Sequence, residues 1–274
     1  MKKMMVNSIL ALAGIYITVL VILFFTQERF IFFTRKINKS QELVLSEFSK
    51  FEINISHVGN NLHGWFIKKE VNSETPLIIY YGGNAEEVSQ NLYDQEYFGE
   101  HSLLYMNYRG YGLSTGRPGQ GALFSDAIYI FDQISKTHNI PPSNIILMGR
   151  SLGAAVATHV ASKREVKGVI LVTPFDSLVK IAKKHYPIFP VKMLLKHPFN
   201  SIQLAPKINI PMMAIIASRD RIIPNEMSLN LVDHWGGNSK YVDIKNAGHN
   251  SIHQYNEYWT AVGRFLSELT KENS

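Results

Sequence analysis

The chain of 274 residues contains no cysteine. This absence excludes a disulfide framework, a thiol nucleophile and zinc–thiolate sites, but it fits oxidising and reducing compartments equally well. The sequence also lacks internal repeats, low-complexity linkers and a basic stripe interleaved with aromatic residues, so we expect no nucleic-acid partner. The net charge of +6 is spread along the chain, which suits either attraction to anionic lipid headgroups or an ordinary solvated surface.

Charge is also missing from one long stretch near the N-terminus. The run Val6–Phe25 is uncharged and apolar, and 20 helical residues span the ~30 Å of a bilayer's hydrocarbon core. No small-residue cleavage site follows in Phe24–Arg29, which favours an uncleaved anchor over a secretory signal. We therefore predict a transmembrane anchor over residues 1–26 and one large domain over 27–274. Basic residues flank both ends of the run, so the side of the membrane stays open.

A serine stands on a predicted sharp turn between a strand and a helix. The turn is the five-residue motif Gly149–Gly153, preceded by the apolar run Ile145–Met148 and followed by the small residues Ala154–Ala157. This is the sequence form of a nucleophile elbow, in which glycines two residues either side of the serine permit the tight bend. The motif predicts that Ser151 lies at a helix N-terminus, where free N–H groups can stabilise an oxyanion.

An acid and a histidine follow in the order that such a serine requires. Asp220 lies in the loop that follows the apolar run Pro211–Ala217, and His249 lies in a glycine-flanked loop after the short run Lys240–Ile244. A serine hydroxyl needs a base to become a nucleophile, and a carboxylate orients that base. The order Ser…Asp…His therefore predicts a catalytic triad of Ser151, Asp220 and His249.

Two alternatives compete with parts of this assignment. Asp176 also follows a buried strand and is the rival for the acid, although Asp220 lies one strand before the histidine. His253 stands four residues after His249, a spacing that can hold a metal. No further ligand cluster accompanies the pair, so we expect neither a metal nor a cofactor.

Strands and helices alternate along the rest of the chain, which predicts an α/β fold with a mostly parallel eight-stranded sheet covered on both faces. Gly59–Asn61 turns the first two strands into an antiparallel pair. The predicted strands are Phe51–Ser56, Leu62–Lys68, Pro76–Tyr81, Leu103–Tyr108, Asn144–Gly149, Gly168–Val172, Pro211–Ala217 and Lys240–Ile244. The predicted helices include Asp126–Thr137, Asn225–Trp235 and His253–Leu269.

These features resemble the alpha/beta-hydrolase superfamily, and within it the membrane-anchored branch of bud-emergence-type and mammalian alpha/beta-hydrolase-domain proteins. The stretches that carry the resemblance lie between about residues 27 and 270. They are Gly83-Asn84-Ala85, Asn107 to Gly112, Gly149 to Gly153, Thr173-Pro174-Phe175, Asp220 with Ile223-Pro224, and Gly248-His249. The resemblance implies an alpha/beta-hydrolase fold and favours a domain on the far side of the membrane.

The same resemblance implies that the backbone N–H groups of Asn84 and Leu152 form the oxyanion hole. Gly82 stands where the branch usually has histidine, which puts the rigidity of this loop in question. Asn84 can equally be a helix N-cap, with Glu86 and Glu87 in the first turn of that helix.

Two further charged residues have structural interpretations. Arg109 suits the pinning of its glycine-rich loop better than the anchoring of a substrate. Asp126 is interpreted as a residue at the start of a helix.

Residues 177–205 interrupt the regular alternation with an apolar, proline-punctuated segment. An insertion at this edge of the sheet can arch over the site as a cap and favour an apolar acyl group, or it can simply pack a helix on the sheet. We therefore expect a membrane-anchored serine hydrolase that cleaves esters or thioesters of small molecules, lipids or acylated proteins. A peptidase or amidase of the same fold, or a silent membrane-tethered interaction protein, is the alternative.

Overall fold

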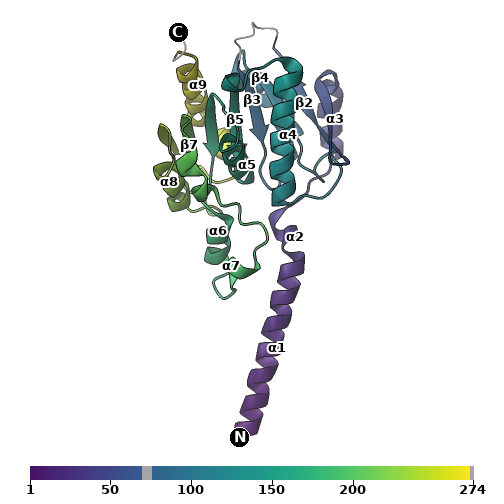
Figure 1. Ribbon diagram of the computed structural model, residues 1–274, viewed down its shortest axis with the longest axis vertical. Coiled ribbons are helices and arrows are strands. Elements are labelled where there is room, and N and C mark those ends of the chain that lie inside the picture. Colours follow the sequence, from purple (N-terminus) through teal and green to yellow (C-terminus); the bar gives the residue numbers. More distant parts are fainter. Residues whose placement is uncertain (70–75, 272–274) are drawn as a thin grey trace.

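The computed structural model describes residues 1–69 and 76–271 and contains one eight-stranded sheet (Figure 1). The strands lie in the order β1-β2-β4-β3-β5-β6-β7-β8. β1 pairs antiparallel with β2 and β2 with β4, and every other pair is parallel. The predicted alpha/beta-hydrolase fold is thereby confirmed. The strands are β1 (Glu52–His57), β2 (Asn60–Ile67), β3 (Leu77–Tyr81), β4 (Ser102–Met106), β5 (Ile145–Arg150), β6 (Gly168–Val172), β7 (Met212–Ala217) and β8 (Ser239–Ile244).

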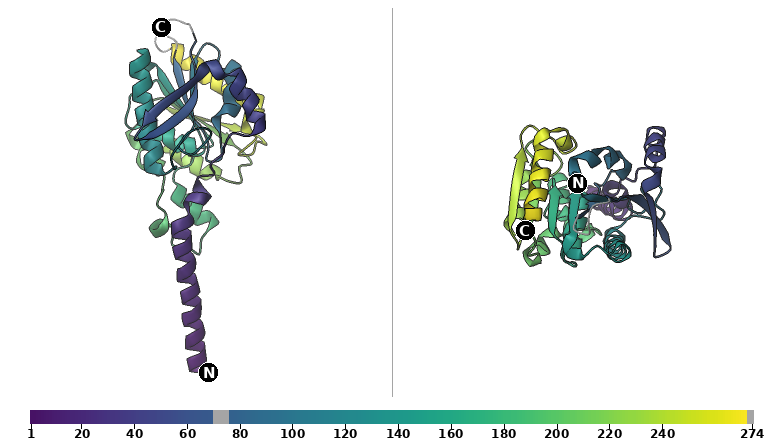
Figure 2. Two further views of the ribbon diagram at one scale, coloured as in Figure 1. Left: turned by 90° about the vertical axis from the view of Figure 1, so that its right-hand side faces the viewer. Right: turned by 90° about the horizontal axis from the view of Figure 1, so that it is seen from above.

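Helices cover both faces of this sheet, which is why its central strands are apolar on both sides. One face packs against α4 (Gln120–His138), α5 (Leu152–Ala161) and α8 (Asn225–Asp233). The other face packs against α3 (Lys39–Glu47), the 3-10 helix η2 (Val88–Phe98) and α9 (Asn256–Lys271). Figure 2 shows the two layers seen along the long axis of the molecule. Short 3-10 turns complete the domain at η1 (Ser49–Phe51), η3 (Pro142–Asn144), η4 (Ser201–Gln203), η5 (Ala205–Lys207) and η6 (Ile252–Gln254).

The N-terminal helix α1 (Lys2–Thr26) projects from the domain as a stalk (Figures 1 and 2). None of its residues is buried against the protein, and it is long and apolar enough to cross a membrane. The short helix α2 (Glu28–Ile31) leads from the stalk into the domain. The carboxyl ends of the parallel strands face the stalk in Figure 1, so the edge of the sheet that carries the predicted site lies on the stalk's side.

Residues 177–205 leave the sheet after β6 and approach the stalk. They form α6 (Leu178–His185) and α7 (Val191–Leu194), which hang below the domain beside the upper part of α1 (Figure 1). This placement fits neither of the two expectations completely, because the segment's middle part packs on α1 rather than on the sheet.

Two local predictions were wrong. Asp126 does not start a helix: α4 begins six residues earlier at Gln120, and Asp126 is buried in its interior. Asn84 caps no helix, because it lies in a turn and the next helical segment starts at Val88 with Glu87 as its cap. The charges of Asp126 and of Glu86, which was expected in the first turn of a helix, are explained by the ion pairs with Arg109 and Arg150 described below.

Candidate active site

The turn that carries Ser151 is fixed by close backbone packing. Ser151 has φ 54° and ψ −114°, a strained conformation for a residue with a side chain. A Cβ on Gly149 would lie 2.3 Å from the carbonyl oxygen of Gly153, and a Cβ on Gly153 would lie 1.9 Å from that of Tyr81. Both glycines are therefore required, as the motif predicts, and the turn directs the serine hydroxyl away from the sheet.

The structure brings Ser151, His249 and Asp220 together. Nε2 of His249 lies 3.1 Å from Oγ of Ser151, and Nδ1 of His249 lies 2.7 Å from Oδ2 of Asp220. The other oxygen of Asp220 accepts hydrogen bonds from the backbone N–H groups of Ile222 and Ile223, each at 2.8 Å. The carboxylate is thus held in place to orient the imidazole, which in turn reaches the hydroxyl. Ser151 and His249 are each 8% exposed, so both are largely buried but not sealed from solvent.

Asp176, the rival acid, lies in a different environment. It is fully buried, forms an ion pair with Lys180 and accepts a hydrogen bond of 2.7 Å from Nδ2 of Asn230. It has no contact with His249 among the interactions of the described residues. His253 likewise joins no metal site: across residues 1–69 and 76–271, no group of three or more His, Asp or Glu side chains is placed to hold a metal ion.

The loop over Gly82–Asn84 lies directly beside the serine, since a Cβ on Gly83 would be 3.8 Å from Cβ of Ser151. Tyr108 donates a hydrogen bond to the Gly82 carbonyl at 2.9 Å, and Tyr111 donates one to the Asn84 carbonyl at 2.6 Å. These bonds hold the loop without the histidine that the resembling branch has at position 82. Among the described residues, the backbone N–H groups of Asn84 and Leu152 have no acceptor in the protein, as an oxyanion hole requires.

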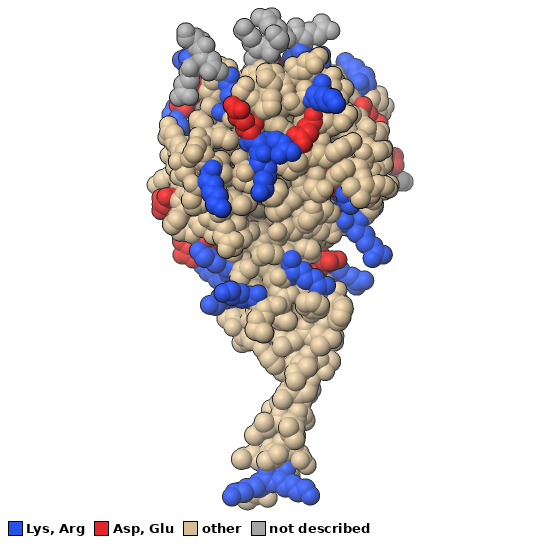
Figure 3. Space-filling view, in the orientation of Figure 1, with Lys and Arg blue, Asp and Glu red and all other residues tan. Residues whose placement is uncertain are grey.

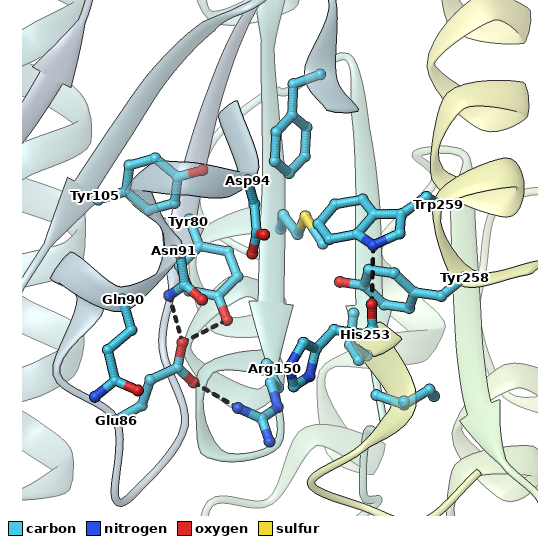
Figure 4. A pocket seen from close by; sticks show the side chains of 14 residues that line it. Tyr80, Glu86, Gln90, Asn91, Asp94, Tyr105, Arg150, His253, Tyr258 and Trp259 are labelled. Atoms are coloured by element: carbon cyan, nitrogen blue, oxygen red, sulfur yellow. Dashed lines mark hydrogen bonds and ion pairs between the residues drawn. The ribbon is translucent and has the colours of Figure 1, made fainter. Parts of the chain in front are cut away.

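Two residues that were not expected in the site, Arg150 and Glu86, connect its parts. Arg150 donates to Glu86 at 3.1 Å, to Oδ1 of Asn250 at 3.1 Å and to the carbonyl of His249 at 3.4 Å. Glu86 also accepts the backbone N–H of Gly83 at 2.8 Å. One ion pair therefore connects the serine turn, the glycine loop and the histidine loop (Figure 4). No local pattern indicates this role of Arg150, because its partners Glu86 and Asn250 lie 64 and 100 positions away in the sequence.

Behind this ion pair lies a cavity of about 210 Å³ between η2 and α9 (Figure 4). Burial, together with the charge of Glu86, raises the pKa of Asp94 in its wall to about 6. Burial and the same glutamate raise the pKa of Tyr80 well above its ordinary value. The cavity is lined by Tyr80, Glu86, Gln90, Asn91, Asp94, Phe98, Tyr105, Met148, Arg150, Val172, Ile252, His253, Tyr258 and Trp259. Ser151 does not line this cavity. The cavity therefore lies behind the serine turn and is not where a substrate would meet the hydroxyl.

Arg109 has a structural partner. Its Nε and Nη2 donate to the two oxygens of Asp126 at 2.6 and 2.7 Å, and His57 contacts the same carboxylate at 2.7 Å. This bidentate pair raises the pKa of Arg109 through the hydrogen bond with Asp126. It joins the glycine-rich loop after β4 to α4 and so supports the pinning role expected for Arg109.

Comparisons with known proteins show the family to which the chain belongs. The family model described as serine hydrolase matches residues 130–268, which include the turn at Ser151 as well as Asp220 and His249. This chain belongs to the serine hydrolase family. An uncharacterised protein of Mycobacterium tuberculosis is 31% identical to this serine hydrolase over 216 residues, which cover 77% of the chain and 76% of the relative.

Two further comparisons place this serine hydrolase among the alpha/beta hydrolases. Alpha/beta hydrolase domain-containing protein 17C of the mouse is 28% identical over 215 residues, covering 76% of this chain and 64% of the mouse protein. A solved esterase from Pyrococcus furiosus has the same fold, with a TM-score of 0.66 and 18% identity over 87% of this chain and 98% of the esterase. The chain is therefore a hydrolytic enzyme of the alpha/beta-hydrolase superfamily.

Proposed function

We propose that this serine hydrolase is a membrane-anchored enzyme that cleaves carboxylic esters or thioesters with an apolar acyl group. The observation that carries the proposal is the contact chain from Asp220 through His249 to Ser151, with distances of 2.7 and 3.1 Å. Hydrogen-bond reach between nucleophile, base and orienting acid is the geometric requirement for acyl transfer. The name of the Pyrococcus furiosus esterase supports ester substrates for the same fold.

The reaction follows from these contacts. Oγ of Ser151 attacks the substrate carbonyl carbon while its proton passes to Nε2 of His249. The carbonyl oxygen becomes an oxyanion that the N–H groups of Asn84 and Leu152 stabilise. The imidazolium, stabilised by Asp220, then protonates the leaving alcohol or thiol, and an acyl-serine ester remains. Water, deprotonated by His249, releases the acid and restores the serine.

The anchor part of the proposal rests on α1. The helix is uncharged from Val6 to Phe25 and unburied along its whole length, and such a surface is stable only in an apolar surrounding. Deletion of residues 1–26 is expected to release the protein from carbonate-washed membranes, because no other element spans a bilayer in the described residues. Retention of the shortened protein after the wash would contradict the anchor.

A fluorophosphonate probe tests the catalytic part. The wild-type protein in membranes should be labelled, Ser151→Ala should not be labelled, and Ser267→Ala on α9 serves as the control that keeps labelling. Labelling that persists in Ser151→Ala would contradict the assignment, and no labelling of the wild type would favour the silent interaction protein. A panel of esters of increasing acyl length, with matched amides, separates the esterase from a peptidase or amidase, which would prefer the amides.

A further inference from the structure

The segment formed by residues 186–194, between α6 and the end of α7, packs along the stalk. The hydroxyl of Tyr16 donates a hydrogen bond of 2.7 Å to the carbonyl of Ile188, and the Tyr16 ring stacks on Phe189 at 6.2 Å between centroids. Closer to the domain, Gln27 donates to the carbonyl of Leu194 at 3.0 Å. The segment is thus attached to α1 at two levels along the helix axis.

The level of Tyr16 decides where this segment lies. Tyr16 precedes Thr26 by ten residues, so its Cα lies ~15 Å along the helix from the domain end of α1. Only 14 helical residues (Lys2–Ile15) remain beyond Tyr16, and they cover ~21 Å, less than the ~30 Å of a hydrocarbon core. If α1 spans the bilayer, the contact between Tyr16 and Ile188 therefore lies inside it.

The chemistry of the segment suits that depth. Ile188 and Met193 are 72% and 85% exposed, and both project from the protein with no apolar partner to cover them. Pro187 and Pro190 carry no N–H group, while the N–H groups of Phe189 and Val191 donate to carbonyls within the segment. In total, five of the segment's seven N–H groups have an acceptor in the protein, which lowers the cost of irregular backbone near lipid.

Most basic side chains near the stalk gather at its domain end. The segment itself carries one charge, the exposed Lys192 of α7, which lies next to the end held by Gln27, so that its long side chain can reach the headgroup level. Figure 3 shows no Lys or Arg along the stalk until its tip and several around its junction with the domain. Among the exposed cations near this junction are Arg29, Arg35 and Lys36, and Lys196 lies over the rings of Phe24 and Phe25 at 4.4 and 5.5 Å. Basic side chains are common where a transmembrane helix meets the lipid headgroups, so this junction is expected at the level of the headgroups.

The proposed oxyanion loop lies close to this same level. The N–H of Phe33 donates to the carbonyl of Asn84 at 3.0 Å, and Nδ2 of Asn84 donates to the carbonyl of Ile31 at 3.3 Å. Ile31 follows the last residue of α1 by five positions. The carbonyl that Ser151 attacks would therefore stand at the height of the headgroups, where the ester groups of membrane lipids lie.

From these observations we propose that residues 186–194 are immersed in the bilayer beside α1, so that the enzyme takes acyl esters whose chains remain in the membrane. This inference rests on the anchor proposed above and names the substrate class of the same site. Immersion would give the acyl chain an apolar surface at Ile188 and Met193 on the lipid side of the site. A short ester dissolved in water needs no such surface.

Site-specific fluorescence tests the immersion directly, because the chain has no native cysteine. An environment-sensitive dye is attached to single cysteines at Ile188, Met193, Leu10 on α1 and Leu43 on α3, an apolar side chain that is 74% exposed. The full chain is placed in phosphatidylcholine nanodiscs with nitroxide-labelled acyl chains. Dyes at positions 188, 193 and 10 should be quenched by the nitroxides, and the dye at 43 by aqueous iodide.

The outcomes separate this inference from the anchor. Quenching by nitroxide at 10 but only by iodide at 188 and 193 would overturn the immersion and leave the anchor in place. Quenching by iodide at all four positions would overturn both.

A kinetic test addresses the substrate class. The double variant Ile188→Asp/Met193→Asp should hydrolyse p-nitrophenyl palmitate in nanodiscs about tenfold or more slowly, because carboxylates are excluded from the bilayer. Its rate on p-nitrophenyl acetate in solution should stay within about twofold of the wild type, as surface residues outside the reacting centre rarely alter chemistry. Leu43→Asp is the matched control and should leave both rates unchanged. An equal loss on both esters, or no loss on the palmitate, would overturn the proposal.

Discussion

Two neighbouring strands of the sheet, β5 and β6, end at the same edge and continue in opposite ways. After β5 the chain bends within the five residues Gly149–Gly153, and both glycines lie too close to neighbouring backbone to carry a side chain. After β6 it runs outward, and the side chains of Ile188 and Met193 are 72% and 85% exposed. The first region is determined by steric contact inside the protein, whereas for the second we have proposed that the bilayer covers what the protein leaves exposed. The predictions below test how far that contrast holds.

The largest expected effect concerns the acid next to His249. Asp220→Asn should lower kcat by about 10³- to 10⁴-fold, because the imidazole loses the carboxylate that fixes its tautomer. Asp176→Asn, which changes the buried partner of Lys180, should leave kcat within a few-fold. Steady-state hydrolysis of a soluble ester by both variants gives the answer, and loss of activity in Asp176→Asn alone would show that the acid is misassigned.

Glycine substitutions test the steric control of the turn. Gly153→Ala should destabilise the protein by about 3 kcal/mol or more, because its Cβ would overlap the carbonyl of Tyr81. Gly263→Ala in α9 has open space around the new methyl group and should stabilise the protein by about 0.5–1 kcal/mol. Thermal unfolding in the same detergent compares the two, and equal stabilities would contradict the steric argument.

Arg150 tests whether the turn depends on its connections to other loops. Arg150→Met should lower kcat by about 10- to 100-fold with a small change in KM, since a misplaced histidine loop affects the transition state more than binding. Arg164→Met, which removes an exposed pair with Asp132, is the control and should leave kcat unchanged. A change in KM alone would assign Arg150 to substrate binding instead.

Asp94 offers a pH-dependent prediction in the cavity behind the turn. Because its folded-state pKa of about 6 lies above its ordinary value, the folded protein binds more protons, and the stability falls as pH rises between about 4 and 6. Asp94→Asn should therefore raise Tm above pH 6 and have little effect near pH 4. A Tm gain that does not vary with pH would argue for a packing effect instead.

The smallest effect is expected in the segment beside the stalk. Ile188→Ala/Met193→Ala should change the free energy of unfolding in detergent by less than about 0.5 kcal/mol, as exposed side chains contribute little to folding. Chemical denaturation measures this value. A cost of several kcal/mol would mean that these side chains are held by the protein and not by its surroundings.

Much of the fold follows from local signals in the sequence. The eight strands lie within two residues of their predicted limits, because runs such as Ile145–Met148 are continuously apolar and end at glycine or turn residues. The contacts of Ser151, His249 and Asp220 also agree with expectation, since each residue follows a strand that ends at the same edge.

Other features depend on residues far apart in the chain, and no local pattern carries them. Asp126 is buried because Arg109 and His57 approach it from other elements. Glu86 forms an ion pair with Arg150 and does not stand in the first turn of a helix. The packing of Tyr16 on Phe189 joins positions 173 apart in sequence, and neither residue by itself indicates the other.

The hydrogen bonds from Phe33 and Asn84 have a practical consequence for anyone who prepares a water-soluble version of this enzyme. A protein that begins at Gln27 keeps residues 28–33 packed against the loop over Gly82–Asn84. A protein that begins at Thr34 loses both hydrogen bonds that join Ile31 and Phe33 to Asn84. The second protein would fold with the same sheet yet turn over slowly, and its weakness would be easily mistaken for the lack of a membrane.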